Sequence, residues 1–216
     1  MSLVIFQPHA SLQTLNTLGV NAQAALLYTL TDIAALPALL SDARVQQRPR
    51  LVLGGGSNIV FTRDFPGVVL KVALRGIRIV AEHDDHVCVE AAAGEPWHAF
   101  VQYTLARGWF GLENLSLIPG TVGAAPIQNI GAYGVEIKSV IEQVSAVRFD
   151  NGHMLELNAY GNFAVMRLAE LIKEKLDISL SMPMPAGAQA DAKEMALSDM
   201  LPYTAGFYGS CILGPL

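Results

Sequence analysis

Two glycine-rich stretches hold most of the residues that could do chemistry in this chain. The first, Gly54-Gly55-Gly56-Ser57-Asn58, follows the short apolar run 51–53. The second, residues 111–134, scatters seven glycines and prolines among apolar residues and follows neither a helical nor a strand period, which predicts a long buried or ligand-lined loop. Glycine lets a backbone approach a ligand closely, and successive free N–H groups form a concavity that binds anions. These stretches therefore suit a phosphate-bearing cofactor.

The first stretch matches neither of two well-known phosphate loops. A Walker loop requires Gly-Lys-Ser/Thr after its glycines, whereas Ser57-Asn58-Ile59 follows here. A Rossmann fingerprint requires a further glycine at the place of Ile59 and a helix behind it, whereas the residues 59–61 are strand-like. The alternative is a tight turn between strands. Three consecutive glycines followed by Ser-Asn exceed what such a turn needs.

No metal site or covalent chemistry is expected. His83-Asp84-Asp85-His86 reads as a solvated hairpin tip, because two histidines without a third convergent ligand do not hold a metal. Cys88 and Cys211 lack metal-ligand spacing and are too few for a disulfide framework, which favours reduced thiols.

The elements that position the glycine-rich stretches are short strands and few helices. Apolar, β-branched runs predict strands at 24–30, 51–53, 68–72, 77–81, 87–91, 144–149 and 154–157. Thr31-Asp32 and Pro37 predict a first helix, and Pro96 opens a second one that Gly108 closes. In that second helix Trp97, Phe100, Val101, Thr104 and Leu105 share one face, so they are expected in the core. The pattern predicts an α+β fold.

Composition excludes several classes of protein. The chain has 216 residues, 52% of them hydrophobic and 15% charged, which indicates a globular protein. A net charge of −5 without a basic cluster gives no reason to expect nucleic acid, and no run of about 18 apolar residues predicts a membrane helix. The N-terminus lacks the features of a signal peptide, which favours the cytoplasm.

Beyond residue 159 the pattern changes. Residues 163–176 predict an amphipathic helix, residues 182–190 resemble a linker, and residues 201–216 form an apolar end without a clear period. Residues 160–216 are therefore left as a tail without an assigned role, and the oligomeric state is not readable from the sequence.

Six ordered blocks resemble a known family. They are Asn16-Thr17-Leu18-Gly19-Val20, Leu53-Gly54-Gly55-Gly56-Ser57-Asn58, Gly94-Glu95-Pro96-Trp97-His98, Gly111-Leu112-Glu113-Asn114-Leu115, Ile118-Pro119-Gly120-Thr121-Val122-Gly123 and Pro126-Ile127-Gln128-Asn129-Ile130-Gly131-Ala132-Tyr133-Gly134. These blocks look like the successive motifs of UDP-N-acetylenolpyruvoylglucosamine reductase (UDP-N-acetylmuramate dehydrogenase). The resemblance covers residues 9–159. It implies an FAD-binding domain at 1–159 of the vanillyl-alcohol-oxidase (PCMH) type, with two α/β subdomains.

The resemblance also implies a cofactor, a reductant and a substrate. Members of the family use NADPH to reduce FAD and pass the hydride to the enolpyruvyl ether of a UDP-sugar, a step in peptidoglycan precursor synthesis that serves cell-wall biogenesis, cell shape and division. The residues matched to FAD binding are Gly54, Gly55, Gly56, Ser57, Asn58, Pro119, Gly120, Thr121, Gly123, Ala124, Gln128, Asn129, Gly131, Ala132, Tyr133 and Gly134. Residues 54–58 and 119–124 are expected to offer N–H groups to the pyrophosphate, the second set at the start of a short helix. Gln128, Asn129 and Tyr133 are expected near the flavin or ribityl chain.

The chain departs from the family where the second half of the reaction needs its residues. The family has an arginine in a Phe-Gly-Tyr-Arg-Asp-Ser-like motif, a proton-donating serine in a Gly-Ser-Phe-Phe-Lys-Asn-Pro-like motif and a glutamate near the C-terminus. None of these motifs, and no substrate-binding domain, is found after residue 157, so Arg167 and Ser179 receive no catalytic role. We expect FAD binding without independent turnover. A non-catalytic flavin-binding module and a flavin oxidase of the same fold stay open as alternatives.

Overall fold

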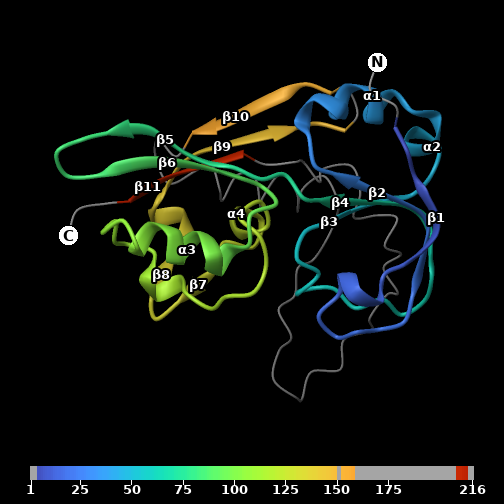
Figure 1. Cartoon of the computed structure of the whole chain (residues 1–216), viewed down its shortest axis with the longest axis horizontal. Coiled ribbons are helices and arrows are strands. Elements are labelled where there is room, and N and C mark those ends of the chain that lie inside the picture. The colour runs from blue at the N-terminus through green and yellow to red at the C-terminus, as the bar shows by residue number, and fades with distance from the viewer. Residues whose placement is uncertain (1–3, 150–151, 159–207, 214–216) are drawn as a thin grey trace, which may run out of the picture.

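Two β-sheets organise the chain (Figure 1). The computed structural model describes residues 4–149, 152–158 and 208–213. The first sheet has the order β1-β2-β4-β3, with β1 at Gln7–Ser11, β2 at Gln23–Leu30, β3 at Arg50–Leu53 and β4 at Phe65–Val72. β1 pairs antiparallel with β2, whereas β2 and β3 both run parallel to β4. The predicted strands β2, β3 and β4 are confirmed, and β1 is an additional strand that the sequence pattern did not reveal.

The second sheet is antiparallel throughout, with the order β10-β9-β11-β6-β5. Its strands are β5 at Ile77–Glu82, β6 at Val87–Ala92, β9 at Ile141–Val147, β10 at Met154–Asn158 and β11 at Tyr208–Leu213. The predicted hairpin tip at 83–86 joins β5 to β6. Strand β11 lies in the apolar end 201–216, for which the sequence showed no clear period, and it pairs with β6 and β9. Its backbone ladder, and not a sequence period, defines this strand.

Short helices connect the strands. On the first sheet these are η1 at Gln13–Leu15, η2 at Ile33–Ala35, α1 at Leu36–Ser41 and α2 at Ala43–Gln46. With the second sheet come α3 at Trp97–Leu105, η3 at Glu113–Leu115, α4 at Ala125–Gln128 and η4 at Ile137–Ser139, together with the small hairpin of β7 (Gly131–Ala132) and β8 (Val135–Glu136). Pro37 lies in the first turn of α1, and Asp32 caps η2 by accepting from the N–H of Ala34, as their sequence positions predicted.

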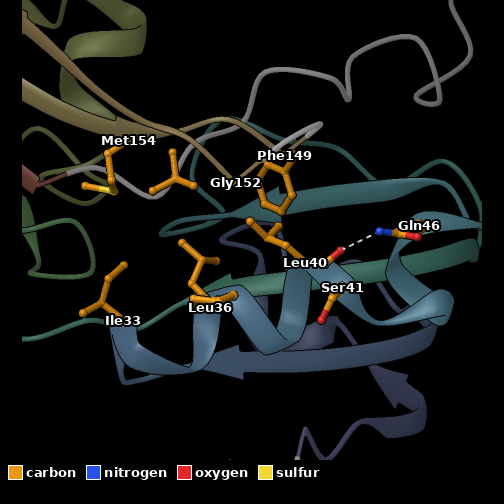
Figure 2. A pocket seen from close by; sticks show the side chains of 10 residues that line it. Ile33, Leu36, Leu40, Ser41, Gln46, Phe149, Gly152 and Met154 are labelled. Atoms are coloured by element: carbon orange, nitrogen blue, oxygen red, sulfur yellow. Dashed lines mark hydrogen bonds between the residues drawn. The ribbon is translucent and has the colours of Figure 1, made fainter.

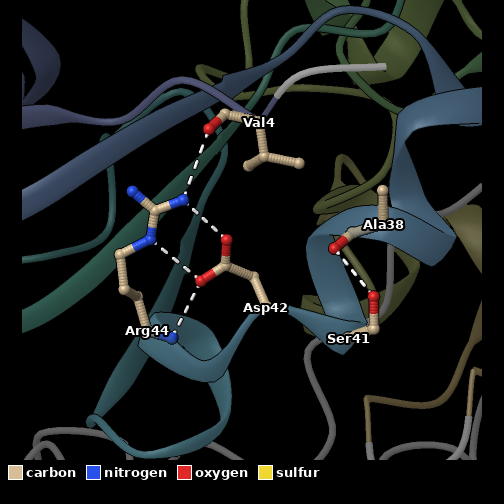
Figure 3. A network of polar contacts seen from close by, with 5 residues as sticks. All are labelled: Val4, Ala38, Ser41, Asp42 and Arg44. Atoms are coloured by element: carbon tan, nitrogen blue, oxygen red, sulfur yellow. Dashed lines mark hydrogen bonds and ion pairs between the residues drawn. The ribbon is translucent and has the colours of Figure 1, made fainter. Parts of the chain in front are cut away.

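Asp42 fixes the turn between α1 and α2 (Figure 3). Its Oδ1 accepts from the N–H of Arg44 at 2.8 Å, and the Arg44 guanidinium donates to both carboxylate oxygens. The same guanidinium reaches the carbonyl of Val4 at 3.4 Å and lies over the ring of Phe6. The hydrogen bond from Arg44 holds the pKa of Asp42 below its ordinary value. This cap therefore depends on an ionised carboxylate.

Helix α3 provides the central core contact. Trp97, Phe100, Val101 and Thr104 are buried on one face, as predicted, while Leu105 is half-buried. The indole N–H of Trp97 donates to the carbonyl of Leu115 at 2.7 Å, so the helix is tied to the start of the second glycine-rich stretch. A buried indole N–H needs such a partner.

Two predictions about the glycine-rich stretches need correction. Residues 59–61 form no strand, because β3 and β4 are parallel and the chain between them must travel back along the sheet. Phe61 in this return segment is buried at 4% exposure and packs in the core of the first sheet. Residues 111–134 are not a continuous loop, since η3, α4 and β7 lie within them.

The remaining predictions concern other parts of the chain. The expected helix 163–176 and linker 182–190 lie outside the described residues. Among the residues that are described, no helix has the length and apolar character to cross a membrane.

Candidate cofactor site

The two predicted phosphate-binding loops lie against each other. A Cβ added to Gly55 would stand 2.9 Å from the Cα of Gly120, and one added to Gly54 would stand 2.8 Å from the Oγ1 of Thr121. From the other side, a Cβ on Gly120 would lie 3.5 Å from the Oγ of Ser57. Distances below 3.0 Å are closer than real Cβ contacts, so these glycines allow two backbones to touch. The sequence blocks 54–58 and 119–124 therefore form one structural unit.

The first loop is braced from behind by the Asn16 block. Gly56 has a φ of +69°, and a Cβ on it would collide with the carbonyl oxygen of Leu15. The N–H of Thr17 donates to the carbonyl of Gly56 at 3.1 Å. Asn16, which is 6% exposed, donates to the carbonyl of Leu12 and accepts from the N–H of Val20. The sequence resemblance included this block without giving it a role; its role here is to fix the loop.

The second loop is braced by the segment before α3. The N–H of Trp97 donates to the carbonyl of Gly120 at 3.1 Å. The N–H of Val122 donates to the carbonyl of Glu95 at 2.9 Å. The N–H of Gly123 donates to the carbonyl of Ala93 at 2.9 Å, and an added Cβ on Gly123 would lie 2.6 Å from the Cβ of Ala93. Three backbone hydrogen bonds and the close contact at Gly123 thus hold the loop, which preorganises its remaining groups.

Several N–H groups at this contact point have no partner among the described residues. Within residues 4–149, 152–158 and 208–213, no acceptor is found for the N–H groups of Gly55, Gly56, Ser57, Asn58, Gly120 and Thr121. Gly56 and Thr121 are buried residues, and buried backbone N–H groups are nearly always paired. Two short runs of unpaired donors on touching loops are the arrangement expected of an anion-binding concavity.

Hydrogen bonds within the chain leave fewer free N–H groups in the second loop than predicted. Pro119 has no N–H, the N–H of Gly123 is used in bracing, and the N–H groups of Ala124 and Ala125 donate to the carbonyl of Thr121. Ala124 and Ala125, at the start of helix α4, therefore offer no free donor. Of the residues 119–124, the two that remain as donors are Gly120 and Thr121.

A cation lies beside the first loop. Lys71, in the otherwise apolar strand β4, donates its ammonium group to the carbonyl of Gly54. Desolvation by burial, with a smaller contribution from Arg75, lowers the pKa of Lys71. A half-buried ammonium is costly without an anion, so its position favours a negatively charged ligand. Sequence reasoning missed Lys71, although a lysine within Val68-Val69-Leu70-Lys71-Val72 was an available signal.

The predicted residues 128–134 occupy a separate turn. Asn129 adopts the left-handed conformation with φ +41°, and its Oδ1 accepts from the N–H of Lys138 at 3.3 Å. Gln128 is exposed, and Tyr133, also with positive φ, is 89% exposed. Gly131 and Ala132 form β7, and Gly134 lies in the turn to β8. In the part of the chain that the structure describes, no hydrogen bond links this turn to the loop at 54–58, and the exposed side chains of Gln128 and Tyr133 are available to a ligand or another surface.

Two other features do not fit a phosphate-bearing cofactor. An apolar cavity of about 440 Å³ lies between α1 and the β9–β10 hairpin, lined mainly by side chains such as Leu36, Leu40, Phe149 and Met154 (Figure 2). No cation lines it.

Cys88 is buried, and desolvation, with a hydrogen bond to Glu142, raises the pKa of its thiol to about 11, so it is no activated nucleophile.

A family model described as an FAD binding domain matches residues 24–158. The chain belongs to this FAD-binding family. The match includes every residue that the sequence assigned to the cofactor. FAD is therefore the phosphate-bearing cofactor of this domain, as predicted.

Curated relatives are named UDP-N-acetylenolpyruvoylglucosamine reductase, which confirms the resemblance seen in the sequence. The protein of Chromobacterium violaceum is 55% identical over 154 residues, which is 71% of this chain and 45% of the relative. That of Pseudomonas fluorescens is 51% identical over 158 residues, or 73% of this chain and 46% of the relative. The chain thus spans a little under half the length of these relatives.

Solved structures support the predicted fold class. The UDP-N-acetylenolpyruvylglucosamine reductase of Thermus caldophilus matches with a TM-score of 0.59 and 25% identity, covering 73% of this chain and 54% of that one. A cholesterol oxidase of Brevibacterium sterolicum matches with a TM-score of 0.57 at 10% identity, covering 99% of this chain and 38% of the oxidase, which shows the fold alone. The α+β fold of the PCMH type with two subdomains is confirmed.

Proposed function

We propose that the touching loops 54–58 and 119–124 bind the pyrophosphate of FAD. The observation that carries this proposal is the set of six N–H groups without an acceptor, four on the first loop and two on the second, in a domain of an FAD-binding family. Lys71 adds a positive charge beside the first loop. The Asn16 block and the segment before α3 hold the donors in place, and Lys71 is held beside them by its hydrogen bond to Gly54, so little ordering is needed on binding.

The residues around the turn 128–134 are proposed to contact the rest of the cofactor. Gln128 and Tyr133 present exposed polar groups, and Asn129 holds the turn by its bond to Lys138. Gly131, Ala132 and Gly134 are included in this contact on the family resemblance alone. FAD supplies hydride transfer when bound, and the chain supplies binding and orientation.

The wider function is proposed from the relatives. The relatives are named as reductases of UDP-N-acetylenolpyruvoylglucosamine, and we infer that this chain forms the flavin-binding part of such an NADPH-dependent enzyme in peptidoglycan precursor synthesis. The substrate would then be a UDP-sugar, and the compartment the cytoplasm. The domain boundaries of 1–159 and 160–216 remain predictions. We assign no catalytic residue, and we expect FAD binding to be separable from turnover.

A purified sample tests both levels of this proposal. We expect a yellow protein that retains FAD through gel filtration and oxidises NADPH at a rate that the UDP-sugar does not change. A colourless protein that fails to take up added FAD would refute the binding proposal. NADPH oxidation that depends on the UDP-sugar would instead refute the expectation that this chain has no independent turnover.

A further inference from the structure

The tip of the β5–β6 hairpin gathers three metal-ligating side chains. His83, His86 and Cys88 have ligand atoms that all lie within 4.8 Å of one another. The hairpin projects at the left of Figure 1, away from β3 and the cofactor loops. The sequence was read as two histidines without a third ligand, but Cys88 follows His86 by two residues. His86 lies one residue before β6 and Cys88 is the second residue of that strand, so the alternation of the strand, continued to His86, brings the two side chains to the same face.

We propose that His83, His86 and Cys88 form a binding site for a zinc ion. The histidine and cysteine donors are those that zinc prefers, and zinc takes them in a tetrahedral arrangement. Metal–ligand bonds of about 2.0–2.3 Å place tetrahedral donors about 3.3–3.8 Å apart. The three side chains therefore need to close by roughly 1 Å, which rotation about their χ angles can provide.

The hairpin holds the two histidines in register. The N–H of His83 donates to the carbonyl of His86 at 2.8 Å, which closes the turn. Their rings stack with centroids 4.3 Å apart and an interplanar angle of 23°. The Asp85 carboxylate lies 2.7 Å from Nδ1 of His86, which leaves Nε2 of that ring to coordinate a metal. A carboxylate on the second nitrogen is the usual support of a metal-bound histidine.

Glu142 of β9 lies beside the cysteine. The thiol of Cys88 donates to Oε2 of Glu142 at 3.3 Å, so a carboxylate stands next to the sulfur and can complete the coordination or accept the thiol proton. Zinc binding displaces that proton, because the thiolate is the ligand. Asp84 and Asp85 add negative charge at the exposed tip, which favours a cation over an anion.

Cobalt(II), a spectroscopic substitute for zinc, tests the site directly. The full chain is stripped with a chelator under reducing conditions, titrated with cobalt, and then with zinc. We expect one cobalt per chain, with intense visible bands of a tetrahedral complex and a near-ultraviolet thiolate-to-cobalt absorption, both of which zinc removes. Cobalt spectra without tetrahedral intensity, or without any thiolate band, would overturn the proposal.

Variants separate this cluster from adventitious binding. Cys88→Ser should abolish the thiolate band and weaken zinc binding more than about 100-fold. Asp85→Asn should weaken zinc binding by about 10-fold. His9→Ala, at an exposed histidine of β1, should change nothing. Far-ultraviolet circular dichroism shows whether the variants fold, and His86→Ala provides a second test at an only partly buried position. A thiolate band that persists in Cys88→Ser, or equal affinity in His86→Ala and wild type, would refute the assignment. FAD binding is measured in parallel and should be unaffected.

Discussion

Replacement of Gly55 distinguishes the size of a side chain from its charge at the cofactor loops. Gly55→Asn and Gly55→Asp introduce side chains of almost equal volume, and both place a Cβ 2.9 Å from the Cα of Gly120. The φ of Gly55 is not in the left-handed region, so backbone conformation alone tolerates either residue. Any difference between the two variants therefore reports the negative charge beside the six unpaired N–H groups.

The structure sets the expected magnitudes. Ordinary contacts begin near 3.4 Å, so the loops must separate by a few tenths of an ångström or more in both variants. Overpacking of this kind costs about 1–3 kcal/mol, which corresponds to a loss of FAD affinity of about 5- to 150-fold if the bound state carries the strain. A carboxylate about 4 Å from a phosphate adds about 1 kcal/mol in water and about 4 kcal/mol at a protein surface. Gly55→Asp should therefore bind FAD at least about fivefold more weakly than Gly55→Asn.

Flavin fluorescence measures both affinities during titration with the protein. Because exposed charges are screened by salt, the gap between the variants should narrow as ionic strength rises. Val80→Asp and Val80→Asn, on the exposed side of β5, serve as the matched control pair and should bind FAD alike. Equal affinities for Gly55→Asp and Gly55→Asn would refute the claim that an anionic group of FAD lies at these loops.

Three further predictions follow from other contacts. Lys71→Met removes the cation beside Gly54 and should weaken FAD binding by about 10-fold. Arg48→Met, at an exposed cation, should leave the dissociation constant of FAD unchanged. Equal losses of affinity in the two variants would contradict the role given to Lys71. Trp97→Phe leaves the carbonyl of Leu115 without its donor and should lower the free energy of unfolding by about 1–3 kcal/mol in urea, more than Trp109→Phe does. Asp42 has a pKa below its ordinary 3.8 in the folded protein, so its contribution is complete above that value and is lost as the pH falls through the lower folded pKa. The urea midpoint of Asp42→Asn should therefore lie below that of wild type at pH 7, and the gap should close in acid; a gap that is constant with pH would contradict this reading.

Local patterns predicted much of the fold. The apolar face of α3, the glycine at its end and the strand run 68–72 are encoded in contiguous residues, and all appear as expected. Residues 59–61 were misread because an apolar triplet is compatible with a strand, whereas the parallel pairing of β3 with β4 requires a return segment there. Strands β1 and β11 depend on partners far along the chain, and a local pattern does not carry that information.

The candidate site, like the fold, was predicted only in part from the sequence. Its glycines were recognised from their number and order, but the reason for them differs from the expectation of ligand contact alone. Positions 54, 55 and 123 need glycine because other parts of the chain approach them closely, which only the folded structure shows. The identity of the free donors likewise depends on which N–H groups are consumed in bracing. The family resemblance assigned Pro119, Gly123 and Ala124 to the cofactor together with Gly120, although only Gly120 among these four keeps a free N–H.

The most direct test of the account compares FAD with riboflavin, which carries the same ring system but no pyrophosphate. The full chain, freed of cofactor, is titrated with each ligand by calorimetry or by flavin fluorescence. The N–H groups of the two loops and the charge of Lys71 predict one FAD per chain and binding of riboflavin that is at least about 100-fold weaker, which corresponds to about 3 kcal/mol. Equal affinity for the two flavins, or no binding of FAD by the folded chain, would contradict the central claim that these loops hold the pyrophosphate.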